Sequence, residues 1–158
     1  MTQTLRCSSI ARPDLLGPAP LDVLVLAHDE RRVRRTVLTL RHGDRVALDL
    51  PEPVLLRQGT RLVLEGGHEV EVVAADERLI EVRGRDAAHL AELAWHLGNR
   101  HASAQVESER ILVPHDPVLR RMLEGLGARL KDVSEPFEPL RGAYHAHASA
   151  DHAHGSGH

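Results

Sequence analysis

The sequence has little cysteine, few aromatic residues and no long apolar run. It has a single cysteine, Cys7, which excludes an internal disulfide and a zinc site made of several thiolates. The aromatic residues are one tryptophan, one phenylalanine and one tyrosine, so any core must be built from leucine, valine and alanine. No apolar run is long enough to cross a bilayer, and residues 1–10 lack the apolar centre of a signal peptide. We therefore expect a soluble cytoplasmic protein that has no membrane partner.

The chain also lacks a net positive charge. The net charge is −3 with histidines neutral, which gives no electrostatic case for nucleic-acid binding. The arginines of residues 31–35 are interpreted as the solvated face of a strand or, alternatively, as a patch for an acidic partner. Histidine, in contrast, is abundant at twelve residues. Five of these lie within the last 14 residues: His145, His147, His152, His154 and His158.

The first half of the chain has the pattern of a small all-β domain, which we place at residues 1–75. Short apolar runs alternate with turn residues, as in a sandwich or a barrel. The turns are expected at residues 42–44 and 66–68, and Pro51 and Pro53 are expected to stop their strand or hold it to a sheet edge. The expected strands are 21–26, 36–40, 46–50, 61–64 and 69–73. The histidines of this half, His28, His42 and His68, are predicted to be turn or strand-end residues rather than ligands.

The second half predicts a ferredoxin-like βαββαβ domain over residues 76–145. Asp86 is expected to cap the first helix, and Gly98 to supply the left-handed turn that ends it. Asp116 and Pro117 begin a second helix, which Gly127 ends. The expected strands are 79–83, 104–107, 110–113 and 128–133. Residues 146–158 are Ala, Ser, Gly, Asp and His only, so they predict a disordered His-rich tail and, overall, an α+β chain.

The end of the first helix, residues 96–101 (His-Leu-Gly-Asn-Arg-His), places two imidazoles and a guanidinium together. His101 is expected just past the helix, where its ring is available as a metal ligand. His96 lies on the last helical turn and is the weaker candidate. Alternatively, both are ordinary cations at the carbonyl end of a helix dipole. His89, seven residues before His96, is expected on the solvated surface.

These residues resemble the UreE family of urease accessory metallochaperones, which carry nickel. The resemblance rests on the helix-end motif together with the His-rich tail, and it extends to Asp116 and to Ala74-Ala75-Asp76-Glu77. Four further segments carry it: Val118-Leu119, Met122-Leu123, Phe137-Glu138-Pro139 and Gly142-Ala143-Tyr144. It implies a β-rich first domain, a ferredoxin-like metal-binding domain and a head-to-head homodimer.

The resemblance also implies roles for single residues. His101 is implied to bind nickel at the dimer interface together with its symmetry mate, and His115 to occupy a peripheral ligand position. The chain departs from the family pattern in two places in this domain. Pro117 stands where some members have a second histidine, and Leu140 stands where the family often has a glutamate. In the first domain, Glu52-Pro53 replaces the usual basic residue and glycine.

Three functions compete at this point. The first is a chaperone that delivers Ni²⁺ to the urease maturation complex, which comprises the accessory GTPase and the urease apoprotein. The second is a His-rich buffer that stores Ni²⁺, Zn²⁺ or Cu²⁺ without delivery. The third, a zinc hydrolase, needs three fixed ligands and a held water, and no HExxH or comparable cluster is present. Imidazole suits all three metals, so the choice of nickel comes from the resemblance and not from the ligand type.

Overall fold

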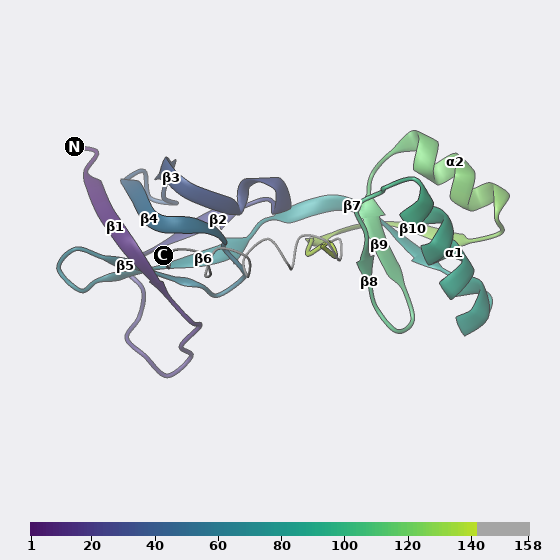
Figure 1. The fold of residues 1–158 in the computed structure, drawn as a ribbon, viewed down its shortest axis with the longest axis horizontal. Helices are drawn as coiled ribbons and strands as arrows, with labels where there is room; N and C mark the ends of the chain where they lie inside the picture. The colour runs from purple at the N-terminus through teal and green to yellow at the C-terminus, as the bar shows by residue number, and fades with distance from the viewer. Residues whose placement is uncertain (142–158) are drawn as a thin grey trace, which may run out of the picture. The chain divides into compact units, whose positions relative to one another are not determined.

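The computed structural model describes residues 1–141, which divide into two compact units. The first unit is Met1–Arg78 together with Ser134–Phe137, and the second is Leu79–Val133 together with residues 138–141. Each unit has its own sheet (Figure 1). The predicted disordered tail, residues 146–158, lies outside the described residues.

The first unit is built on one six-stranded mixed sheet in the order β2-β6-β5-β1-β4-β3. The pairs β1/β4 and β2/β6 are parallel, and the neighbours β1/β5, β3/β4 and β5/β6 are antiparallel. This is one sheet rather than the two facing sheets of a sandwich. Its strands and the short helix η1 are β1 (Thr4–Ala11), β2 (Asp22–Leu26), η1 (His28–Glu30), β3 (Arg32–Thr39), β4 (Arg45–Leu55), β5 (Arg61–Leu64) and β6 (Glu69–Ala74).

Local turn chemistry joins the antiparallel pairs, as the sequence predicts. Gly43, at φ 100°, turns the chain between β3 and β4. Gly66 and Gly67, at φ 100° and 87°, do the same between β5 and β6. Glycine tolerates positive φ because it has no Cβ. Alternate residues of β4, Val46 and Leu48, then point into the core of this unit.

Of the two alternatives for Pro51 and Pro53, the end of their strand is wrong, because β4 continues to Leu55. The other alternative, a position at a sheet edge, fits the end of the β1 pairing at Leu48. The pairing of β3 with β4 shifts register between Val33 and Arg35, and both prolines lie in that shift. The parallel partner β1 pairs with β4 only as far as Leu48. The prolines therefore occupy the part of β4 where their missing N–H groups cost no regular ladder bond.

One member of the predicted arginine surface is also misplaced. Arg31 is 3% exposed, and its Nη2 donates a hydrogen bond to the carbonyl of Phe137. Its own carbonyl accepts from the N–H of Leu56 at 2.8 Å. Arg32 and Arg34 are exposed on β3, as expected. Arg31 is instead a structural residue that holds Phe137, the residue after β10, within the first unit.

The second unit confirms the α+β, ferredoxin-like βαββαβ prediction. Its sheet order, β10-β7-β9-β8, places the first and third strands of the motif at the centre. Asp86 accepts a hydrogen bond from the N–H of His89 and caps the first helix, while Asp116 caps the second with Pro117 at its first position. The elements are β7 (Asp76–Arg83), α1 (Ala87–Asn99), β8 (Gln105–Val106), β9 (Ile111–Pro114), α2 (Pro117–Gly125) and β10 (Arg129–Pro136).

Both helices pack on one face of this sheet through a shared apolar core. That core contains the buried residues Ile80, Val82, Leu90, Leu93, Leu97, Ile111, Val113 and Leu123. Burying each such side chain contributes about 1.5–3 kcal/mol. On the other face Glu81 accepts hydrogen bonds from Arg83 and Arg110, at 2.8 and 2.9 Å, and these bonds lower the pKa of Glu81. The core fixes α1, and with it the helix end that carries the histidine motif.

Candidate metal centre

The candidate site is built on the C-terminal end of α1, whose last residue is Asn99. The N–H of His101 donates to the carbonyl of Gly98 at 3.0 Å, and the N–H of Ala102 donates to that of Leu97 at 3.1 Å. These two bonds define a Schellman motif. In this motif the residue just past the cap adopts the left-handed conformation, and here that residue is His101, at φ 53°.

The expectation that Gly98 supplies the left-handed turn is therefore wrong. Gly98 lies inside the helix, and the turn falls three residues later, on a side chain with a Cβ. Helix α2 ends in the same motif with Gly127, at φ 77°, in the equivalent position. His101 is the non-glycine residue with positive φ in the part of the chain that the structure describes. The left-handed conformation costs a residue with a Cβ about 1 kcal/mol, so α1 ends with a histidine where glycine is more stable.

The two histidines of the motif differ in their surroundings. His101 is exposed, just past the end of the helix. His96 is half-buried, with its ring edge-on to Trp95 at a centroid distance of 5.0 Å and its Nε2 3.9 Å from a carboxylate oxygen of Glu92. His96 already has contacts within α1, whereas the ring of His101 faces solvent.

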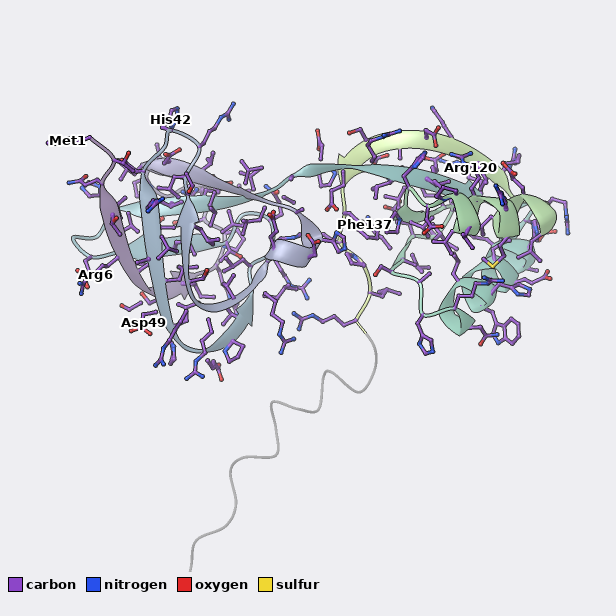
Figure 2. The ribbon with its side chains drawn as sticks, turned by 90° about the horizontal axis from the view of Figure 1, so that it is seen from above. Met1, Arg6, His42, Asp49, Arg120 and Phe137 are labelled. Atoms are coloured by element: carbon purple, nitrogen blue, oxygen red, sulfur yellow. The ribbon has the colours of Figure 1, made fainter. Side chains whose placement is uncertain are left out.

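His115 lies at the start of α2, immediately before its cap residue Asp116. Its Nε2 is 3.6 Å from Oδ1 of Asp132 on β10. The same carboxylate oxygen accepts a hydrogen bond from Nη2 of Arg120, one of the side chains labelled in Figure 2. The carboxylate nearest to His115 is therefore already engaged by a guanidinium.

The expectation that His89 lies on the solvated surface is wrong. His89 is 4% exposed, and both of its ring nitrogens are bonded. The N–H of Arg85 donates to its Nδ1 at 3.0 Å, so Nε2 carries the proton and lies 2.8 Å from the carbonyl of Leu126. The ring joins the start of α1 to the end of α2 and is not available to a metal.

His42 and His68 lie at a turn and a strand end, as predicted, and His28 begins the short helix η1. Two of these three histidines have carboxylate partners that the sequence does not indicate. His42 donates from both its N–H and its Nδ1 to Asp22, the latter at 2.8 Å, and its ring is exposed (Figure 2). His28 makes the same pair of bonds to Glu77, with Nδ1 at 2.7 Å. These partners are 20 and 49 residues apart in sequence, so no local pattern could have shown them.

The segment after Phe137 returns to the neighbourhood of the helix end. The N–H of Glu138 donates to Oε1 of Gln105, and the N–H of Leu140 donates to the carbonyl of Ala104, both at 2.8 Å. Ala104 is three residues past His101. The side chain of Leu140 is 68% exposed, so its replacement of a glutamate removes no buried contact.

Two family models together match almost all of the chain. Residues 9–75 match the N-terminal domain of the UreE urease accessory protein, and residues 77–158 match its C-terminal domain. The chain belongs to the UreE family of urease accessory proteins.

Three relatives show how far the similarity extends. The urease accessory protein UreE of Agrobacterium fabrum is 53% identical over 148 residues, which is 94% of this chain and 92% of the relative. The UreE of Rhizobium meliloti is 54% identical over 147 residues, 93% of this chain and 96% of the relative. The UreE of Rhizobium rhizogenes is 57% identical over 133 residues, 84% and 80% respectively. The predicted family resemblance is confirmed.

Within residues 1–141 of this UreE-family chain, no three His, Cys, Asp or Glu side chains gather closely enough to hold a metal ion. Cys7 is buried in the first unit, and burial raises the pKa of its thiol, which disfavours the thiolate a metal needs. A pocket of about 280 Å³ beside it has no histidine in its lining, which is Arg6, Cys7, Ser8, Ala47, Asp49 and Glu65. None of the described helices is long and apolar enough to span a bilayer. The five tail histidines lie outside the described residues.

Proposed function

We propose that this protein is a cytoplasmic nickel chaperone that delivers Ni²⁺ for assembly of the urease active site. Its nickel site is formed by His101 from two chains of a homodimer. The observation that carries this proposal is the left-handed conformation of an exposed histidine where glycine is more stable. A strained residue kept at a surface turn points to a function for its side chain.

A two-fold interface supplies what one chain lacks. The described residues of a single chain gather no set of three potential ligands. In an isologous dimer, one His101 faces the other, so a single residue provides two imidazoles. Imidazole nitrogen is a suitable ligand for Ni²⁺, and an exposed, partly filled site suits release because a partner can replace its ligands one at a time.

Histidines of the tail supply further ligands to the nickel ion at His101, because the chain tethers them close to it. Leu140 lies five residues before His145, and its N–H is hydrogen-bonded to the carbonyl of Ala104. Ala104 itself lies three residues after His101. Five residues reach at most about 18 Å and seven at most about 25 Å, so His145, and over a somewhat longer tether His147, are held at high effective concentration near the helix end. The more distant His152, His154 and His158 then serve as additional storage ligands.

The remaining candidates have smaller roles in this proposal. His115 is a peripheral ligand, and the carboxylate close to its ring, Asp132, is shared with Arg120. His96 supports the helix end without binding the delivered metal. The recipients are the urease accessory GTPase and the urease apoprotein complex.

The decisive experiment compares His101→Gly with His96→Ala in nickel-dependent urease activation in vitro at limiting nickel. We expect His101→Gly to lower activation at least tenfold, because one substitution removes both imidazoles of the shared site while glycine suits the turn. His96→Ala is the matched control from the same motif and should lower it less than twofold. Calorimetric nickel titration should show the loss of the tightest site in His101→Gly alone.

Full activation by His101→Gly would reject the shared site. A tail that buffers Ni²⁺, Zn²⁺ or Cu²⁺ without directed delivery would then be the better explanation, and the stoichiometry of the titration would report it.

A further inference from the structure

The loop between β1 and β2, residues 12–21, exposes two adjacent leucines. Leu15 is 95% exposed and Leu16 is 99% exposed. Isolated apolar residues on a surface need no explanation, but two neighbouring leucines left almost entirely in water are different. They make no contribution to the core of the first unit, so another role has to account for them.

The loop is held in one conformation by its own residues. Oδ1 of Asp14 accepts hydrogen bonds from the N–H groups of Leu16 and Gly17, at 3.0 and 2.9 Å. A Cβ on Gly17 would lie 2.3 Å from Oδ2 of Asp14, so any larger residue there displaces the carboxylate that holds the turn. Three prolines, Pro13, Pro18 and Pro20, restrict the rest of the loop.

The base of the loop is fastened to the sheet by Arg61 of β5. Arg61 is 6% exposed, and its Nη2 donates to the carbonyl of Asp14 at 3.1 Å. Its guanidinium lies 3.6 Å from a carboxylate oxygen of Glu71 and 4.0 Å from one of Glu69. Pro13 also packs where a Cβ on Gly59 would lie, at 3.2 Å. The two leucines are thus presented by a turn with fixed supports.

We propose that Leu15 and Leu16 are a docking tip that inserts into an apolar groove of a protein partner in urease maturation. A rigid turn loses little conformational entropy on binding, which favours such a role. The base of the tip carries three carboxylates, Glu69, Glu71 and the exposed Asp14, and two guanidiniums, the buried Arg61 and the exposed Arg12. The surplus of one negative charge favours a groove with a basic rim. The choice of partner rests on the proposed function, whereas the apolar tip does not depend on nickel.

The charge pattern argues against a membrane as the occupant. The guanidinium of Arg61 is buried and faces two glutamates, which leaves Arg12 as the exposed cation of the loop. Attachment of an apolar tip to an anionic bilayer is normally supported by several basic residues. A second copy of this chain is also disfavoured, because its own tip would bring the same carboxylates.

The test measures binding of the full-length protein to a purified complex of urease apoprotein and accessory GTPase by surface plasmon resonance. We expect Leu15→Ser/Leu16→Ser to raise the Kd at least about tenfold, since both side chains lose their burial in the complex. Val37→Thr, a nearly isosteric change at a residue of the first unit that is 55% exposed, is the control and should leave the Kd unchanged. Nickel stoichiometry and circular dichroism should be unchanged in both variants.

Gly17→Ala tests the turn itself, because it keeps both leucines and displaces the Asp14 carboxylate. We expect an intermediate rise in Kd, and an affinity equal to that of the unchanged protein would contradict a role for the fixed turn. The docking proposal is overturned if the double variant binds as tightly as the unchanged protein, or if the unchanged protein does not bind the complex.

It is also overturned if the variant instead loses self-association in sedimentation velocity, or loses attachment to phosphatidylserine vesicles. If docking depends on the leucines but no nickel passes to urease, the proposed chaperone function fails and the docking surface stands.

Discussion

At the scale of single residues, His101 combines an unfavourable backbone conformation with a favourable ligand chemistry. Its counterpart in α2 is Gly127, which meets the same conformational need without strain. The sequence predicts that His101 lies just past the helix, but it places the left-handed residue at Gly98. Glycine is the residue that local preference places in a left-handed turn, so the sequence indicates Gly98. Helix α1 instead continues to Asn99, which puts His101 in the left-handed position.

His101→Gly is therefore expected to increase the free energy of unfolding by about 1 kcal/mol, because glycine adopts positive φ at no steric cost. Urea denaturation of the two proteins without metal measures the difference. His101→Ala keeps a Cβ in the same conformation and should show no such gain. A destabilised His101→Gly would mean that the imidazole has stabilising contacts in the metal-free protein.

His89→Ala should lower the free energy of unfolding by about 2–3 kcal/mol. The substitution removes two part-buried hydrogen bonds and leaves the carbonyl of Leu126 without the imidazole partner. His96→Ala on the same helix should change it by less than about 0.5 kcal/mol, because its ring is partly exposed. Similar effects in the two variants would contradict the structural role assigned to His89. The sequence could not separate these histidines, since burial at the start of α1 depends on α2.

At the scale of secondary structure, local patterns predict the helices and hairpins well and the long-range pairings poorly. The caps Asp86 and Asp116 are confirmed, as are the turns at Gly43 and Gly66-Gly67. Strand β1 was not predicted, because Thr4–Ala11 has mixed polar and apolar residues and pairs with segments about 40 and 55 residues away. Because β1 and β4 are parallel, no short turn joins them, and the sequence next to β1 does not indicate the pairing.

The contact between β2 and the β3–β4 turn should make the first unit sensitive to acid. Burial raises the pKa of Asp22, but hydrogen bonds from the N–H of Val23 and from His42 outweigh this effect and leave the pKa below its usual value. The stabilisation is therefore complete above the unfolded pKa of about 3.9, and it is lost as pH falls through the folded value.

Asp22→Asn should consequently lower the free energy of unfolding at pH 7, and the difference from the unchanged protein should shrink below about pH 3.9. Chemical denaturation between pH 7 and pH 2 measures both proteins. A difference that is constant over this range would show that the carboxylate charge at Asp22 is not responsible.

At the scale of the whole molecule, the proposal divides nickel binding between a folded site and a tail. The tail histidines lie in a segment without apolar residues other than alanine, whereas His101 lies at the end of a helix held by a buried core. Deleting residues 146–158 should lower the number of Ni²⁺ ions bound and leave at least one per dimer in a calorimetric titration. Complete loss of nickel binding would reject the folded site.

The first unit has one further consequence, for how the protein is made. Its segments are separated in the chain, because residues 1–78 are completed by Ser134–Phe137. Phe137 is fully buried, its carbonyl accepts a bond from Arg31, and its ring meets that of His28 edge-on at 5.0 Å. At about 5–20 residues per second, a ribosome needs roughly 3–12 s to add the 59 residues from 79 to 137. The first β-rich half of the nascent chain therefore waits, without its last buried aromatic residue, until the ferredoxin-like half has been translated.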